Sequence, residues 1–253
     1  MSGAQRTGDR TFVRFTPRQR AEHVMVMSLF LILAFTGFPQ KFPDTWAARV
    51  SVDLFGGLDA MRFWHRFAGF AFAFLSILHL AIAGAGVILG RIRPSIVPNR
   101  KDFTDAIQQM RYYLGTAPEP ARFDRFDYRQ KFEYWGLVLG GLVMIVTGVI
   151  LYAPVLFATY LPGELIPAAK VAHSNEGLMA FLVVITWHVF NAHLSPEAFP
   201  WDPSIFTGRI PEHKLKHEHP LEWERLTGET IGSSEAAASP QAAPAPVAPE
   251  KKP

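Results

Sequence analysis

The sequence contains no cysteine. Without cysteine there is no disulfide, no thiolate nucleophile, no iron–sulfur cluster on cysteine ligands and no covalently attached c-type haem. Charged residues are also scarce, at 19% of 253 residues, where a soluble domain carries about a quarter. The net charge of +3 is too small and too scattered for nucleic-acid binding, and no basic stripe interleaved with aromatic residues occurs. These absences exclude cysteine-based catalysis and nucleic-acid recognition.

The sequence instead contains long runs of apolar residues. From Phe67 to Gly90, only Ser76 and His79 are polar. Runs above roughly 18 apolar residues indicate helices that cross a bilayer. We therefore expect an all-α integral membrane protein, a four-helix up-down bundle in contact with membrane lipid. The expected spans, of which the first is short and ends near a Pro39–Pro43 turn, are His23–Pro39, His65–Gly90, Tyr134–Ala158 and Val171–His193.

Basic residues predict the orientation of these spans. Five arginines precede the first span and nine lysines and arginines lie between the second and third, against three and one in the other connections. Because positive loops stay inside, both termini and the inner loop 91–133 are expected in the cytoplasm of a bacterial inner membrane. The expected segments are a cytoplasmic N-terminus 1–22, a four-span domain 23–194, a cytoplasmic tail 195–231 and a disordered Ala/Pro-rich tail 232–253.

Two smaller features concern the cytoplasmic parts. The inner loop is expected to hold a short surface helix, capped by Asp102 or Thr104 and ended by Gly115. The histidines after the last span are expected to lie on a solvated tail rather than in a metal site; they are His213, His217 and His219.

Histidines in the spans carry the chemistry. An ionisable side chain inside the membrane costs a few kcal/mol and is a functional hypothesis by default. A single histidine on an apolar helix is usually a packing residue, but five of the nine histidines lie in or at the edges of spans. They are His23, His65, His79, His173 and His188, while His193 ends the last span.

The spacing of these histidines favours two stacked sites. His65 and His79 are 14 residues apart, and His173 and His188 are 15 apart. Such separations return to within about 40–60° of one helix face and span roughly 21–22 Å. Helical geometry can thus pair His65 with His173 at the outer level and His79 with His188 at the inner level. Two haems in a bundle core need this arrangement, which makes little sense for zinc.

Other residues in the spans support this interpretation less directly. Arg66 and Arg20 lie beside histidines and are candidates to pair with haem propionates or to reach lipid headgroups. Glu176 is a candidate to accept a proton from a quinol, or to stabilise the first turn of the last span. Close approach of a porphyrin, or plain helix packing, accounts for the glycines within spans, which are Gly37, Gly69, Gly136, Gly140, Gly141, Gly148 and Gly177.

Four stretches within residues 12–195 resemble a known family: RFTPRQRAEHVMVMSLFLILAFTGFP, WHRFAG, KFEYWGLVLGGLVMIVTGVILY and AHSNEGLMAFLVVITWHVFNAH. They resemble the spans of the bacterial di-haem membrane cytochrome b superfamily, which includes the formate dehydrogenase gamma subunit and the b-type cytochrome of nickel–iron hydrogenases. The resemblance implies an outer haem b on His65 and His173 and an inner haem b on His23 and His188. It also implies a quinone bound near one haem edge.

Two departures from the family pattern matter. The spacing in the last span is 15 where the family usually has 14, so either the rotamer of His188 or the winding of the helix must differ. His79 has no counterpart in the formate dehydrogenase type but resembles the two-histidine helix of the cytochrome b in bc complexes. His23 and His79 therefore compete for the inner iron opposite His188, and the resemblance favours His23. The one left over, with His193, is a candidate for a third haem.

The expected function is that of an electron-transfer subunit of a quinone-linked oxidoreductase complex in a respiratory chain. It exchanges electrons between the quinone pool and a partner redox subunit, either a multihaem c-type cytochrome or an iron–sulfur protein. Because the chain has no cysteine, the substrate-converting site is expected on another subunit. Two rival functions need no haem: a proton or solute carrier, which the absence of broken-helix repeats disfavours, and a structural membrane anchor.

The arginine bias predicts that the chain ends in the cytoplasm. Alkaline phosphatase fused after Pro253 should be inactive, because this reporter works only after export, whereas the same reporter inserted after Asp44, in the first connection, should be active. Enzyme assays on intact cells measure both. An active fusion after Pro253 would overturn the four-span topology.

Overall fold

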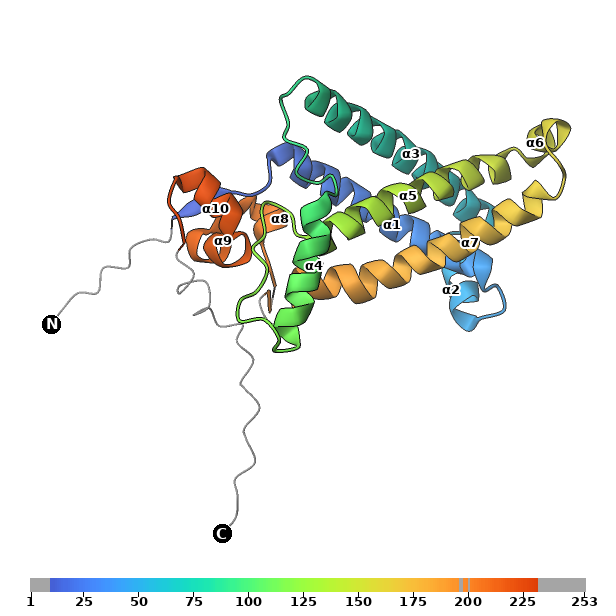
Figure 1. The fold of residues 1–253 in the computed structure, drawn as a ribbon. Helices are drawn as coiled ribbons and strands as arrows, with labels where there is room; N and C mark the ends of the chain where they lie inside the picture. The colour runs from blue at the N-terminus through green and yellow to red at the C-terminus, as the bar shows by residue number, and fades with distance from the viewer. Residues whose placement is uncertain (1–9, 196–197, 200, 232–253) are drawn as a thin grey trace, which may run out of the picture. The chain divides into compact units, whose positions relative to one another are not determined.

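The computed structural model describes residues 10–195, 198–199 and 201–231, and it is mainly helical (Figure 1). The expected tail at residues 232–253 lies outside the described residues. Along the chain the elements are β1 (Thr11–Val13), α1 (Pro17–Lys41), α2 (Trp46–Leu54), α3 (Leu58–Ile88), α4 (Arg100–Tyr113), α5 (Tyr128–Tyr152), α6 (Pro154–Tyr160), α7 (Leu165–Val183), the π-helices η1 (Val184–His188) and η2 (Phe190–Leu194), α8 (Ser204–Thr207), β2 (Arg209–Pro211), α9 (Glu212–Glu218) and α10 (Pro220–Thr227).

Four helices are long and apolar enough to cross a membrane, which confirms the expected four spans. They are α1, α3, α5 and the continuous helix Leu165–Leu194 formed by α7, η1 and η2. Successive long helices run in alternating directions along the chain (Figure 1). Many of their apolar side chains are exposed in the protein alone, such as Phe74 and Ile77. A surface of this kind is covered by lipid tails in a bilayer.

The first span is longer than the sequence suggested. Thr16 caps α1 by accepting a hydrogen bond from the backbone of Gln19, whose side chain accepts one from the backbone of Thr16. The helix then continues through Pro39 to Lys41, giving 25 residues. This end lies within the expected Pro39–Pro43 turn, and the helix can pass Pro39 because a proline removes one backbone hydrogen bond but keeps a helical φ. No local thinning of the bilayer is needed for a helix of this length.

The third span ends earlier than expected. Pro154 closes α5 at Tyr152, and the separate short helix α6 begins at the proline. The residue before a proline is pushed out of the α region, and Ala153 has φ −125° and ψ 58°. The expected continuation to Ala158 is therefore wrong.

The chain forms two compact units, which are described separately. The four-helix unit comprises Phe15–Pro94 and Glu133–Phe206. The small unit comprises the described parts of three segments, residues 10–14, 95–132 and 207–231. The expected surface helix of the inner loop is α4, which Gly115 ends with φ +70°. Its cap is Asn99, and Asp102 is the third helical residue, which completes the capping box instead of providing the cap.

A two-stranded antiparallel sheet and two short helices build the core of the small unit. Phe12 of β1 lies opposite Ile210 of β2. The core cluster consists of Ile210, Leu215, Trp223 and Ile231, with Phe12 packed against it. Much of the expected cytoplasmic tail 195–231 is therefore folded, although β1 and β2 are each only three residues long.

A buried charge network holds the three segments of the small unit together. The Glu222 carboxylate, 2% exposed, accepts hydrogen bonds from Arg14 at 2.6 Å and from Arg125 at 2.8 Å. Arg125 also donates to the backbone carbonyl of Arg14. These residues precede α1, lie between α3 and α5, and follow the last span. Their contact requires all three segments to lie on one side of the membrane, as in a chain with four spans.

His219 completes this network as a neutral acceptor. Its Nδ1–H donates to the carbonyl of Asp124 at 2.7 Å, and its Nε2 accepts from Arg14 at 2.9 Å. Burial, followed by the charge of Arg14, lowers the pKa of His219 to about 3. The expectation that His219 lies on a solvated tail is wrong, although His213 is exposed.

We predict that the small unit loses stability in acid through His219. Its folded pKa of about 3 lies below the ordinary value of 6.5, so the stabilisation is complete above pH 6.5. It is lost at up to about 1.4 kcal/mol per pH unit as the pH falls towards 3. Amide hydrogen exchange of β2 and α10 in the full chain, corrected for intrinsic rates, measures this. His219→Gln should flatten the pH dependence and His213→Gln should keep it; a wild-type slope in His219→Gln would contradict the prediction.

Candidate functional site: two histidine pairs

The four-helix unit brings four of the predicted histidines together in two pairs. His65 of α3 faces His173 of α7, with ring centroids 6.3 Å apart and ring planes at 75°. His23 of α1 faces His188 of η1, again with centroids 6.3 Å apart and planes at 40°. We call these the 65/173 pair and the 23/188 pair. All four side chains are half-buried.

The spacing within each pair fits one metal ion between two rings. A first-row metal binds an imidazole nitrogen at about 2 Å, and that nitrogen lies roughly 1 Å from the ring centre. Two imidazoles on opposite sides of one ion therefore have ring centres about 6 Å apart. Both pairs meet this condition.

The number of ligands distinguishes between metals. A zinc site needs three or four protein ligands, whereas haem iron takes only axial ligands from the protein. Within residues 10–195, 198–199 and 201–231, no three histidine or carboxylate side chains are grouped so as to hold a metal ion. The donor set therefore fits haem and does not fit zinc.

A Thr-Gly dipeptide on α1 supports His65. The Thr36 hydroxyl donates to the carbonyl of Ile32 at 2.7 Å, and its oxygen lies 2.8 Å from Nδ1 of His65. Because the hydroxyl proton is already used, the oxygen accepts from Nδ1–H, which leaves the Nε2 lone pair of His65 free to bind a metal. A Cβ on Gly37 would lie 3.3 Å from Cε1 of the same ring.

The same arrangement recurs on α5 at His173. The Thr147 hydroxyl donates to the carbonyl of Val143 at 2.6 Å and lies 3.0 Å from Nδ1 of His173. A Cβ on Gly148 would lie 3.2 Å from Cε1 of this ring. These two glycines therefore make room for imidazoles, whereas the expected alternatives were close approach of a porphyrin and plain helix packing. Sequence reasoning missed Thr147, although the repeated Thr-Gly dipeptide was a visible signal.

The 23/188 pair has different neighbours. Nδ1 of His188 lies 3.1 Å from the Glu133 carboxylate. Nδ1 of His23 is buried and has no hydrogen-bond partner in the described part of the chain. The same holds for Nε of Arg20, one helical turn before His23. A guanidinium with an unsatisfied donor beside this pair fits an anionic group such as a propionate.

His79 is not brought to another histidine. Its Nδ1 lies 2.9 Å from the carboxylate of Glu22, and its Nε2 lies 3.0 Å from the hydroxyl of Tyr134. Arg18 donates to the same carboxylate at 2.6 Å. Both ring nitrogens of His79 thus face protein groups, and the histidine opposite His188 is His23.

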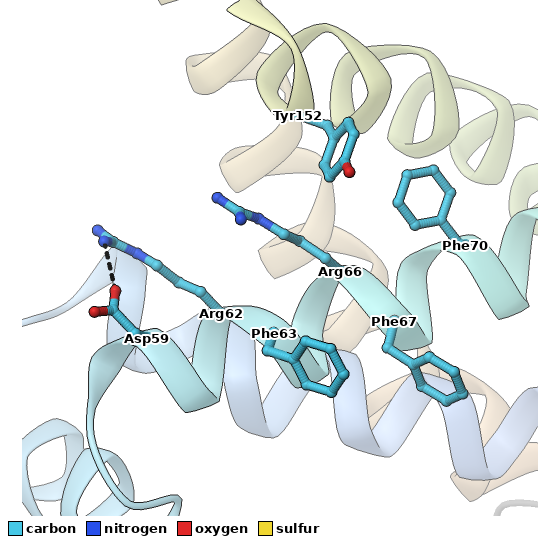
Figure 2. A pocket seen from close by; sticks show the side chains of 7 residues that line it. All are labelled: Asp59, Arg62, Phe63, Arg66, Phe67, Phe70 and Tyr152. Atoms are coloured by element: carbon cyan, nitrogen blue, oxygen red, sulfur yellow. Dashed lines mark ion pairs between the residues drawn. The ribbon is translucent and has the colours of Figure 1, made fainter.

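Arg66 lies beside the 65/173 pair on an open groove. The groove has a volume of about 520 Å³ and opens between α3 and the end of α5 (Figure 2). Arg66 and Arg62 extend on the side of Tyr152, and the Arg66 guanidinium lies 5.8 Å from the centre of the Tyr152 ring. Arg62 pairs with Asp59 at 3.8 Å. Propionate binding and contact with lipid headgroups are both compatible with this exposed position of Arg66.

Two further predicted residues lie elsewhere in the last span. Glu176, one turn after His173, points its carboxylate at Gly140 of α5, where any Cβ would collide with it. His193 stacks on Trp201, with ring centroids 5.2 Å apart and planes at 16°. The two histidines considered for a third haem thus have different ring partners, which are Trp201 for His193 and Glu22 and Tyr134 for His79.

Residues 14–197 match the prokaryotic cytochrome b561 family. This match covers more than half of the chain. The protein belongs to the prokaryotic cytochrome b561 family. Family membership, together with four apolar helices, makes it a multi-pass bacterial membrane cytochrome of the electron-transport class, with haem b as the implied cofactor.

Individual relatives agree with this family. The nitrate-inducible formate dehydrogenase cytochrome b556(Fdn) subunit of Escherichia coli K12 is 23% identical over 202 residues, which cover 79% of this chain and 85% of that protein. The formate dehydrogenase cytochrome b556 subunit of Haemophilus influenzae is 24% identical over 197 residues, 76% of this chain and 75% of that protein. Both relatives are named as cytochrome b556 subunits of a formate dehydrogenase.

The π-helix η1 accounts for the unusual histidine spacing. In an α-helix, 15 residues overshoot four turns by about 60°, while 14 residues fall about 40° short. A π-turn is closed by an i→i+5 hydrogen bond and therefore contains one residue more than an α-helical turn. In η1 this hydrogen bond runs from the N–H of Val189 to the carbonyl of Val184. The extra residue is thus absorbed just before His188. Of the two expected alternatives, the structure shows altered winding.

We predict that this cytochrome tolerates a deletion in η1 better than an insertion. Deleting Ile185 should turn the π-turn into an α-helix that keeps His188 opposite His23, so the haem content stays the same. Inserting one alanine after Ile185 should rotate His188 by about 100° and remove one haem. Haem quantification on the purified variants measures both. Loss in the deletion, with retention in the insertion, would show that η1 does not set the position of His188.

Proposed function

We propose that this cytochrome b561 family member holds two b haems and passes electrons between a membrane quinone and a partner redox subunit. One haem is held by His65 and His173, and the other by His23 and His188. The observation that supports this most strongly is the equal ring separation of 6.3 Å in two pairs on three different helices.

Each part of this proposal rests on named side chains. Haem b, when bound, supplies iron that changes its charge by one electron at a time. The helices leave the four imidazoles half-buried, and Thr36 and Thr147 hold two of the rings in the tautomer that offers Nε2. Arg20 and Arg66 are the proposed partners of the propionates.

The two haem sites are proposed at different depths in the membrane. His173 and His188 are 15 residues apart on one continuous helix, which is roughly 22 Å. With both termini in the cytoplasm, the 65/173 pair lies near the outer surface and the 23/188 pair near the inner surface. Electrons can then cross most of the bilayer within one subunit.

The quinone site is proposed beside the 23/188 pair. Oxidation of a quinol releases two electrons and two protons, so its site needs polar groups that can bind its oxygens. His79, Glu22 and Tyr134 form such a hydrogen-bonded cluster, and Glu22 immediately precedes His23 in α1. Glu176, one turn after His173, is the alternative proton acceptor at the other pair.

The partner is proposed to be a multihaem c-type cytochrome or an iron–sulfur protein. The relatives are subunits of formate dehydrogenases, and this chain has no cysteine for an iron–sulfur cluster of its own. The reaction that supplies or consumes the electrons is therefore assigned to another subunit.

Reduced-minus-oxidised absorption spectroscopy of the purified full chain tests the proposal. A b-type spectrum with two haems per chain is the expected result, measured by quantifying extracted haem. No haem at all would favour a membrane anchor or a proton or solute carrier instead.

We predict that the ligands of the two haems can be removed one site at a time. His173→Ala should lose one haem and keep the other, and His23→Ala should lose the other haem, because each removes a histidine that would hold that haem. His213→Ala, at an exposed histidine of the small unit, is the control and should keep both. Two haems at full occupancy in His173→Ala would contradict the assignment.

We predict that His79→Ala keeps both haems but slows quinol oxidation, since His79 contacts Glu22 and Tyr134 rather than another histidine. Haem quantification and a quinol-oxidation assay on the same membranes separate the two effects. Loss of haem in His79→Ala, together with retention in His23→Ala, would instead support a pairing like that of bc complexes.

A further inference from the structure

The hydrogen-bond partners of the four imidazoles differ between the pairs. In the 65/173 pair, both Nδ1 atoms face the hydroxyl of a threonine. In the 23/188 pair, Nδ1 of His188 faces the carboxylate of Glu133 at 3.1 Å, and Nδ1 of His23 has no hydrogen-bond partner in the described part of the chain. A neutral acceptor thus serves one pair and an ionisable acceptor the other.

The negative charge of Glu133 acts mainly on His188. The Glu133 side chain is 13% exposed. Among the described residues its carboxylate contacts the imidazole of His188, and no lysine or arginine lies within ion-pair distance. By comparison, the Glu22 carboxylate on His79 is also bound by Arg18. Glu133 is therefore the less neutralised of the two carboxylates that contact histidines in the four-helix unit.

A hydrogen bond from a ligating imidazole to a carboxylate lowers the midpoint potential of the haem iron. A carboxylate that accepts the Nδ1–H of a ligating imidazole makes the ring a more basic, more electron-donating ligand. A stronger donor stabilises ferric iron relative to ferrous iron, and nearby negative charge acts in the same direction. A threonine hydroxyl that donates its own proton to a backbone carbonyl has a much weaker effect.

We propose that Glu133 tunes the 23/188 haem to a lower midpoint potential than the 65/173 haem. This inference rests on the proposed function, because it requires one haem at each pair. Its consequence is that a single electron on the protein resides mainly on the haem of the 65/173 pair. Glu133 acts through His188 and is thus a positioning and tuning residue.

Potentiometric titration of the full-length protein, followed by the b-type absorption band, tests the proposal without changing Glu133. His173→Ala keeps only the 23/188 haem, and His23→Ala keeps only the 65/173 haem. The haem retained in His173→Ala should titrate at the lower of the two wild-type potentials. If it titrates at the higher one, the proposal is overturned.

The direct variant is Glu133→Gln, which keeps the side-chain shape and removes the charge. At the same ambient potential, it should lower the ferric-to-ferrous ratio of the 23/188 haem at least tenfold, which corresponds to about 59 mV for one electron. The 65/173 haem should not shift, and the haem content should stay at two. Glu22→Gln, which removes a carboxylate from His79, should shift the 23/188 haem less.

Thr147→Val completes the comparison by removing a neutral acceptor from His173, and it should leave the 23/188 potential unchanged. Two haems with no shift in Glu133→Gln, or an equal shift in Glu22→Gln, would overturn this inference alone. Fewer than two haems in the wild-type protein would overturn the proposed function and this inference together.

Discussion

A single distance governs the four-helix unit: the separation at which two imidazoles from different helices can share one metal ion. Two histidine side chains must lie at the same depth in the bundle and on facing sides of neighbouring helices. The four-helix unit meets this condition twice. Gly37 and Gly148 let neighbouring helices come close enough to touch the rings. The π-turn before His188 then adjusts the rotation of the last span by one residue. The ring separation of 6.3 Å in both pairs meets this requirement.

The two pairs meet that requirement with different chemistry. Threonine hydroxyls that donate hydrogen bonds to carbonyls of the preceding turn hold His65 and His173 without introducing charge. Around the 23/188 pair, ionisable groups gather instead, with Glu133 on His188 and Arg20 one turn before His23. An apolar interior tolerates such groups only when they are paired or bind a ligand. The polar groups near His23 and His188 are therefore the reason that we propose the quinone site beside this pair.

Sequence patterns could predict the spans and the candidate histidines, because hydropathy and helical periodicity are local properties. They could not choose between His23 and His79, since the rotation of one helix against another depends on packing that periodicity does not contain. Glu133 was missed for the same reason, as nothing in its sequence neighbourhood indicates contact with His188. Pro154 is a helix-stop signal in the sequence, but it was overlooked because it lies within a long apolar run. The burial of His219 could not be predicted because the charges around it pair with distant segments, as Glu222 does with Arg14 and Arg125.

The small unit is assembled from segments that the ribosome makes far apart in time. Strand β1 is synthesised before the first span, yet its partner β2 follows the last one. Arg14 likewise meets Glu222 only after more than two hundred further residues have been added. The N-terminal strand and a buried arginine thus remain without their final contacts throughout membrane insertion. Completion of the small unit is consequently a late step of biogenesis, because it requires the segment that follows the last span.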